Sequence, residues 1–428
     1  MGVSAPNHTL ALGILRGLSE FCGKERTGIG DRPSTSDLGL NTSGNDLKST
    51  AEHFSFVRHR LYVSLAGMAQ PTKEQIENII SGQMQELMEK VPANSGVSAA
   101  FYCPSHPYVK RYYNYGRAND RAEMSEHTII CIGSTTKIFT GSLIAYLHIL
   151  DKVGPLDRTL VRKHLPAVKS DTMTLLQLAT HTSGMPENIP DDPGERLFKD
   201  EPPTPTLKEW WSNPSNYGKT VGQWVYSNIA FVTLGYAVEA IANDGAFKPG
   251  YSKYLSDWIT TQTNPPMTRT WTTVPEDVPP ELVATGHAEN GDTRKIQNGS
   301  DIKSTAADMH TWVKANLDAI NGPTTSFLQA LHNATSVHLR NLKHPNGKDT
   351  GFDMGLAWQI SNRNASEPTV ISKDGAVGRG GSSSWFGLVP QSEQHDWPEM
   401  GLAMCLNSFG SNPGRFGRSA LLEIAKLF

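Results

Sequence analysis

The sequence of 428 residues lacks long apolar runs and is poor in cysteine. No segment approaches the roughly 18 apolar residues that a membrane-spanning helix needs, so we expect no membrane span. The four cysteines, at positions 22, 103, 131 and 405, form no Cys-x-x-Cys pair. We therefore expect free buried thiols in a reducing compartment, with a single disulfide as the alternative. The 14 histidines form no His-Glu-x-x-His pattern, so the sequence predicts no metal and no other cofactor.

The sequence also lacks a strong excess of charge of either sign. Its formal net charge is −3, and charged residues make up 19% of the chain. This balance gives no reason to expect nucleic acid as a partner. The apolar piece Leu10–Leu15 has no basic residues before it and ends at Arg16, unlike a secretion signal. The sequence therefore favours a cytoplasmic protein.

The length of the chain predicts more than one lobe. Residues 1–70 show little periodicity and are dominated over Gly23–Ser49 by Gly, Ser, Thr, Asn and Asp, which predicts a poorly ordered leader. Residues 71–148 and 285–428 mix helix and strand patterns. Residues 149–284 alternate helix-like pieces with loops rich in Pro and Gly. We therefore expect an α/β domain made from two separate segments, with a mainly helical insertion between them.

The core is expected to begin with an amphipathic helix over Lys73–Met88, where apolar residues recur every three or four positions. Strand-like stretches occur early and late in the chain: Val97–Cys103, Tyr112–Arg117, Gly355–Ile360, Ser383–Val389 and Gly401–Leu406. Turn-forming residues join the first two, which predicts an antiparallel hairpin. The predicted fold class is α/β (α+β), with an antiparallel sheet assembled from both chain ends and flanked by helices.

A serine and a lysine three positions apart are the first candidate catalytic residues. Ser134-Thr-Thr-Lys137 opens an apolar run with helical spacing, so we expect a helix from about Ser134. Residues three apart share a helix face, which allows Ser134 Oγ and Lys137 Nζ to meet. A serine nucleophile needs a base, and a lysine serves when burial or a neighbouring cation lowers its pKa. Ser-x-x-Lys is a common chance match, so the hypothesis depends on partners further along the chain.

Two more motifs follow in order. Tyr226-Ser-Asn228 precedes an apolar helix-like segment, and Lys373-Asp-Gly375 comes before a strand-like run; His181-Thr-Ser-Gly184 lies between the first and second motifs. This order resembles the serine β-lactamase and penicillin-binding protein superfamily. The Tyr-x-Asn form is similar to the branch that holds class C β-lactamases, D-alanyl-D-alanine carboxypeptidases, family VIII esterases and lovastatin-type acyltransferases. The resemblance covers about residues 74–428, and it implies a β-lactamase/transpeptidase-like fold.

The resemblance also implies roles for four side chains. Ser134 would attack an ester, amide or thioester carbonyl and become acylated. Lys137 and Tyr226 are both candidates for the base, and the sequence does not decide between them. Asn228 would donate to the substrate or orient Lys137.

The third motif would complete the site. The implied oxyanion hole consists of the backbone N–H groups of Ser134 and of Ala376, which follows Lys373 and Gly375 on an edge strand. In an alternative alignment, the third motif would be Arg379-Gly-Gly381 instead of Lys373-Asp-Gly375, with Ser382 or Ser383 near the site. Trp385 is expected to pack in the core rather than to line an acyl pocket.

One position departs from the family pattern. The middle residue of the third motif is usually Thr or Ser, and here it is Asp374. An acid at this position would compete with a substrate carboxylate and would be able to pair with Lys373. β-Lactams and D-alanyl peptides carry such a carboxylate, so the departure favours neutral esters or acyl-carrier thioesters.

The sequence thus predicts a serine hydrolase that forms an acyl-Ser134 intermediate from a small-molecule ester, lactone or thioester. An acyltransferase of secondary metabolism is the first alternative, with an acyl-carrier protein as a candidate partner. A non-catalytic binding or scaffold member of the superfamily is the second. His181 is interpreted as a structural hydrogen-bonding residue rather than as a general base.

Overall fold

The computed structural model describes residues 70–189, 200–245, 248, 250–288, 290–296, 301–361, 366–378, 380–392 and 395–428. The leader expected over residues 1–70 lies outside this set, except for Gln70. Residues Gln70–Phe428 form one compact unit.

A seven-stranded antiparallel sheet forms the centre of this unit, with the strand order β2-β1-β11-β10-β9-β8-β7. Its strands are β1 (Gly96–Tyr102), β2 (Tyr112–Gly116), β7 (Asp353–Met354), β8 (Gln359–Ser361), β9 (Val370–Val377), β10 (Ser382–Val389) and β11 (Met400–Leu406). Two short pairs lie apart from it: β3 (Ile130–Cys131) with β6 (Lys303–Ser304), and β4 (Thr285–His287) with β5 (Thr293–Lys295). The central strands β1, β10 and β11 are buried along nearly their whole length, which agrees with the lack of alternation between polar and apolar residues in their sequences.

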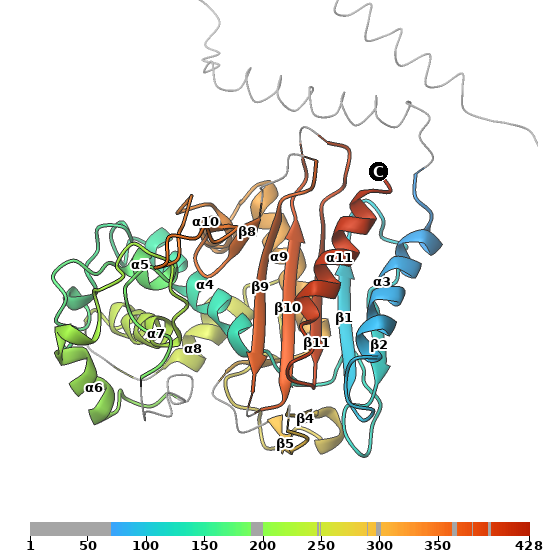
Figure 1. Cartoon of the computed structure of the whole chain (residues 1–428), viewed down its shortest axis with the longest axis horizontal. Coiled ribbons are helices and arrows are strands. Elements are labelled where there is room, and N and C mark those ends of the chain that lie inside the picture. Colours follow the sequence, from blue (N-terminus) through green and yellow to red (C-terminus); the bar gives the residue numbers. More distant parts are fainter. Residues whose placement is uncertain are drawn as a thin grey trace, which may run out of the picture. The chain divides into compact units, whose positions relative to one another are not determined.

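Helices cover both faces of the sheet (Figure 1). The helices are α3 (Lys73–Met88), α4 (Thr136–Ile149), α5 (Leu175–Ala179), α6 (Pro205–Ser212), α7 (Asn228–Ala242), α8 (Tyr251–Leu255), α9 (Ala306–Asn321), α10 (Ser326–Thr335) and α11 (Pro413–Ala425). The apolar sides of α3 and α11 pack on one face, where Met404 and Trp385 belong to the same core cluster. The other face is covered by α9, and the core there is continuous with α4 and α7. Among the described helices, none has the length and apolar character needed to cross a bilayer.

Most of the expected elements are found where the sequence placed them. The helix over Lys73–Met88 and the hairpin of β1 and β2 are confirmed, and β1 pairs with β11, so the two chain ends do build one sheet. The strand expected over Gly355–Ile360 is wrong over Gly355–Trp358, because β8 begins only at Gln359. The buried loop between β7 and β8 packs against two helices instead. In this loop the backbone N–H groups of Leu356 and Ala357 donate to the carbonyls of Ala334 on α10 and Ala179 on α5.

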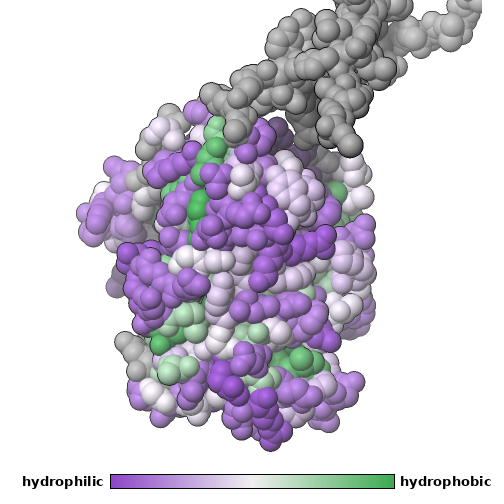
Figure 2. All heavy atoms as spheres, turned by 90° about the vertical axis from the view of Figure 1, so that its right-hand side faces the viewer, coloured by the Kyte–Doolittle hydropathy of each residue, from purple (hydrophilic) through white to green (hydrophobic). Residues whose placement is uncertain are grey.

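The surface seen from the side of α3 and β2 is mainly hydrophilic, with scattered hydrophobic side chains (Figure 2). The three cysteines of the described part, Cys103, Cys131 and Cys405, are buried and free, as the sequence predicts. Burial raises the pKa of the Cys131 and Cys405 thiols to about 12, so both are protonated and unreactive at neutral pH.

Candidate active site

Ser134 lies on a tight turn that the sheet holds in place. Gly133–Thr135 form a short 3₁₀ helix immediately before α4, so the α-helix begins two residues later than the sequence suggests. Gly133 has a φ of 53° there, which glycine adopts readily. Ser384 on β10 bonds both sides of the turn, donating to the carbonyl of Ile132 at 2.7 Å and sharing a 2.7 Å hydrogen bond with Thr135 Oγ1. The turn leaves the Ser134 side chain half-exposed.

Lys137 is buried one helical turn away, only 6% exposed. Its Nζ donates to Ser134 Oγ at 2.9 Å and to Asn228 Oδ1 at 2.8 Å. Burial lowers the pKa of the Lys137 ammonium to about 8, although the charges of Asp301 and Glu187 oppose this shift. A lysine with this pKa exchanges its proton near neutral pH, as a base for a serine must.

Tyr226 completes a triangle around the serine. Its hydroxyl donates to Ser134 Oγ at 2.5 Å, across 92 positions of sequence. Lys137 Nζ lies 5.0 Å and Lys373 Nζ 5.1 Å from the centroid of the tyrosine ring. Two ammonium groups therefore face one aromatic ring, an arrangement in which cation–π attraction stabilises the positive charges.

The segment around Tyr226 is fixed by the start of α7 and by the loop after His181. Ser227 is the N-cap of α7, and its hydroxyl also donates to the carbonyl of Pro186 at 2.6 Å. The carbonyl of Glu187 accepts the backbone N–H of Asn228 at 2.8 Å. Asn188 Oδ1 accepts from Asn228 Nδ2 at 2.9 Å, which orients the amide so that its oxygen faces Lys137. Sequence reasoning missed Asn188 and Glu187; their only signal was their position just after the His-Thr-Ser-Gly phrase.

His181 holds the other side of Tyr226. Its backbone carbonyl accepts from Val225 N at 2.9 Å, and its Nδ1 accepts from Ser227 N at 3.1 Å. Its ring lies 4.6 Å from the Tyr226 ring. Burial and the nearby charges of Lys373 and Lys137 hold the pKa of His181 well below its usual range, so the imidazole is neutral. These contacts fit the structural role expected from the sequence.

The end of β9 faces the serine turn with an open edge. β8 pairs with Val370–Ser372 only, so among the described residues no strand pairs with β9 on that side from Lys373 onward. A Cβ on Gly375 would lie 2.1 Å from the carbonyl oxygen of Ile132, and one on Gly133 would lie 2.7 Å from Ala376 N. Strand and turn thus pack backbone against backbone, with Ala376 next to the turn that carries Ser134.

Asp374 does not pair with Lys373 as the sequence suggested. Side chains alternate along a strand, so Asp374 lies on the opposite face of β9 from Lys373 and Gly375. Its strand neighbour on β10 is Trp385, and its Oδ1 lies against Gly414 in the first turn of α11. No ion pair involving Asp374 is found in the described part of the chain, and its side chain is exposed.

The alternative position for the third motif, Arg379-Gly-Gly381, stays a prediction. Arg379 lies outside the described residues. Ser382 Oγ donates to the carbonyl of Cys131 at 2.9 Å and Ser383 Oγ to that of Ser408 at 2.8 Å, so both hydroxyls are used inside the fold. Trp385 is 3% exposed and packs in the core beneath α11, as expected.

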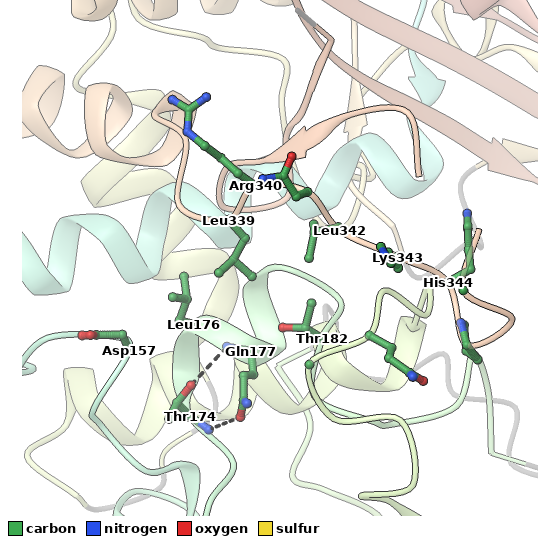
Figure 3. A pocket seen from close by; sticks show the side chains of 15 residues that line it. Asp157, Thr174, Leu176, Gln177, Thr182, Leu339, Arg340, Leu342, Lys343 and His344 are labelled. Atoms are coloured by element: carbon green, nitrogen blue, oxygen red, sulfur yellow. Dashed lines mark hydrogen bonds between the residues drawn. The ribbon is translucent and has the colours of Figure 1, made fainter. Parts of the chain in front are cut away.

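A separate pocket of about 620 Å³ lies elsewhere on the helical part. Figure 3 shows that Leu339 and Leu342 line it, and that the reciprocal hydrogen bonds between Thr174 and Gln177 cap α5 at its edge. None of the residues grouped around Ser134 lines this pocket. We therefore assign it no part in the chemistry.

Known proteins resemble this chain in sequence and in fold. The family model for Beta-lactamase matches residues 84–426. A β-lactamase of Lysobacter lactamgenus is 28% identical over 50% of this chain and 54% of its own length, so the match spans about half of that protein. The D-alanyl-D-alanine-carboxypeptidase/endopeptidase AmpH of Escherichia coli K12 is 26% identical over 66% of this chain and 73% of its own length. A crystal structure of a class C β-lactamase superposes with a TM-score of 0.65 at 21% identity, covering 84% of this chain and 100% of that one.

The fold is that of the class C β-lactamases, a mixed α/β architecture with an antiparallel sheet flanked by helices. The chain belongs to the Beta-lactamase family and is a serine hydrolase of that family. The resemblance drawn from its motifs is thereby confirmed.

Proposed function

We propose that the protein forms an acyl-enzyme on Ser134 and acts on an ester or thioester of a small molecule. One observation carries this proposal: Ser134 Oγ is within hydrogen-bond distance of both Lys137 Nζ and Tyr226 OH. A serine with a base beside it is the arrangement that nucleophilic catalysis requires.

The proposed first step is attack by Ser134 on the substrate carbonyl. Lys137 or Tyr226 takes the hydroxyl proton, and the same proton is later delivered to the leaving group. The backbone N–H groups of Ser134 and Ala376 stabilise the oxyanion, and losing one such donor typically costs about 3 kcal/mol of transition-state stabilisation. Asn228 orients Lys137 through the 2.8 Å hydrogen bond to its Oδ1. Lys373 adds a second positive charge beside Tyr226.

The substrate class rests on Asp374. Asp374 stands where the family pattern has Thr or Ser, and its side chain lies on the opposite face of β9 from Lys373, against Gly414. We propose that its negative charge, one residue from the motif lysine, repels a substrate carboxylate through space and disfavours β-lactams and D-alanyl peptides. Neutral esters and thioesters escape this repulsion. Acyl transfer to a second substrate would use the same acyl-Ser134 intermediate. An added acceptor that speeds turnover would therefore indicate transfer, and turnover that no acceptor speeds would indicate hydrolysis.

The test is labelling by a fluorophosphonate, followed by intact-protein mass, together with turnover of a short-chain p-nitrophenyl ester. We expect one adduct on the wild type and none on Ser134→Ala, with ester turnover lost in the same variant. Ser212→Ala, which changes an exposed serine on α6, is the matched control and should label and turn over like the wild type. Absence of an adduct on folded wild-type protein would refute the proposal and favour a binding member of the family.

A further inference from the structure

Trp224 lies two residues before Tyr226 and takes no part in the steps proposed above. Its indole ring is half-buried, and the ring centroid lies 6.4 Å from that of Tyr226 and 6.0 Å from that of His181. His181 in turn lies 4.6 Å from the Tyr226 ring. The three rings therefore form one cluster, at separations at which aromatic side chains stabilise one another.

A loop from the last third of the chain packs against Trp224. This loop, residues 339–354, is closed at its base by two backbone hydrogen bonds between its first and last residues. The carbonyl of Lys343 accepts the backbone N–H of Trp224 at 2.8 Å. The rings of His344 and Phe352 each lie 5.2 Å from the indole, edge to face. The loop thus contacts Trp224 through its backbone and through two aromatic rings.

The indole is held by ring packing and not by its N–H group. Trp224 Nε1 is buried, and no hydrogen-bond partner for it is found in the described part of the chain. A buried, unpaired N–H costs free energy, so the N–H gives no reason for a tryptophan at this position. What the indole supplies is a large rigid ring that contacts both the loop 339–354 and Tyr226.

From this cluster we infer that Trp224 is a positioning residue, which transmits the packing of the loop 339–354 to Tyr226 and holds the tyrosine hydroxyl against Ser134. The inference rests on the proposed function and adds a residue to the same site. The Tyr226 hydroxyl donates to Ser134 Oγ at 2.5 Å. A group that moves a proton must be held within about 0.5 Å of its productive position, by neighbours that are themselves packed in place.

The test is the rate at which a fluorophosphonate labels Ser134, followed by intact-protein mass. In Trp224→Leu, which removes the aromatic ring, we expect this rate to fall about tenfold, because the Tyr226 hydroxyl is no longer held in one place. Trp224→Phe keeps an aromatic ring in the cluster and loses an N–H that has no described partner, so its rate should stay within about threefold of the wild type. Phe352→Leu weakens the packing from the loop side and should fall between the two.

Trp210→Leu is the matched control. Trp210 lies on α6, is also half-buried, and packs on a tyrosine, Tyr217, at 5.7 Å. Within the described ranges it has no ring contact or hydrogen bond with the residues grouped around Ser134, so its labelling rate should equal that of the wild type. All rates are measured well below the melting temperature of each variant, so that unfolding does not contribute to them.

A double-mutant cycle separates positioning of Tyr226 from a general structural effect. In the Tyr226→Phe background the hydroxyl that Trp224 positions is gone, so adding Trp224→Leu should change the remaining rate by less than about twofold. A full tenfold loss in that background would overturn the inference. If Tyr226→Phe leaves no measurable rate, the phenylalanine variant decides, because a Trp224→Phe protein as slow as Trp224→Leu would overturn it as well.

The outcomes keep this inference apart from the proposed function. A labelled wild type together with a Trp224→Leu variant that reacts at the same rate overturns the inference alone. Failure of the folded wild-type protein to be labelled overturns the proposed function and the inference with it.

Discussion

Lys137 is the residue on which the proposed chemistry depends most. It is buried, it bonds both Ser134 and Asn228, and its ammonium lies beside the Tyr226 ring. Burial also lowers the pKa of Lys373, and the neighbouring Lys137 charge acts in the same direction. The Lys137 charge therefore makes Lys373 easier to deprotonate, whereas burial alone lowers the pKa of Lys137.

The first prediction concerns pH. Because the pKa of Lys137 is lowered to about 8, the amine is protonated below this pH and able to accept the Ser134 proton above it. We expect the rate of fluorophosphonate labelling to rise with pH through an inflection near 8. A rate that falls through the same range would show that Lys137 must stay charged, and would assign the base to Tyr226.

A second prediction concerns His181, which positions Tyr226 without touching Ser134 in any described contact. His181→Ala removes the acceptor for Ser227 N and leaves a buried N–H unpaired, at a cost of about 1–3 kcal/mol. His181→Asn keeps an acceptor and tolerates the φ of 59°. We expect kcat and the melting temperature to fall clearly in the alanine variant and less in the asparagine variant. Equal losses in both would assign the effect to the imidazole ring that packs against Tyr226.

At the level of elements, α4 is held by polar contacts as well as by apolar packing. Thr140 on α4 shares a 2.7 Å hydrogen bond with the hydroxyl of Tyr251 on α8. The start of α8 is in turn held by Glu239 of α7, whose Oε1 accepts from Gly250 N at 2.7 Å and from Tyr251 N at 3.0 Å. The helix that carries Lys137 is thus linked to α7 through a buried carboxyl group.

The third prediction follows from that carboxyl group. Burial raises the pKa of Glu239 from 4.5 to about 7. Because the pKa is raised in the folded state, Glu239 stabilises the fold fully below pH about 4.5. This stabilisation, about 3 kcal/mol in total, is lost as the pH rises through about 7. In Glu239→Gln this pH dependence should be absent. Urea unfolding at pH 5 and pH 8 should therefore show that the free energy of unfolding of the variant rises relative to that of the wild type between the two pH values. A difference that is the same at both pH values would contradict the shift.

The fourth prediction concerns the packing of α11 on the sheet. A Cβ on Gly417 would lie 2.2 Å from Trp385 Cε3, so Gly417→Ala forces the helix or the indole to move and should cost about 1–3 kcal/mol. Gly82 on α3 has nothing within 4 Å of its Cβ position, so Gly82→Ala should stabilise the helix by about 0.5–1 kcal/mol. Thermal unfolding of the two variants should move in opposite directions.

At the level of the whole molecule, the fold depends on contacts between distant parts of the sequence. β1 and β2, near residue 100, complete a sheet whose other strands all come after residue 350. The candidate site is spread in the same way over the segment before α4, the start of α7 and the end of β9. Cutting the chain between these segments would therefore remove part of the sheet and part of the site together.

The fifth prediction follows from the compact unit Gln70–Phe428. The two large apolar clusters on the faces of the sheet lie within it. A protein that begins at Gln70 should unfold in one cooperative transition and react with a fluorophosphonate at the wild-type rate. Loss of labelling in a folded Gln70–Phe428 protein would show that residues 1–69 contribute to the site.

Much of this protein was determined by its sequence alone. The spacing of apolar residues placed α3, β1, β10 and β11, because a helix and a strand each impose a fixed period on the side chains that are buried. The order of the three motifs gave the family, and the positions of Ser134 and Lys137 on one helical turn followed from a local rule.

Only the tertiary structure decided which contacts form between these segments. The contact of Tyr226 with Ser134, the support of Asn228 by Asn188, and the start of β8 at Gln359 rather than at Gly355 all depend on packing between segments far apart in the chain. The place of Asp374 was settled in the same way, by the burial of Lys373 toward the site and the alternation of side chains along β9. Local periodicity fixes which residues face inward, but the partner that each one meets is fixed by how the whole chain packs.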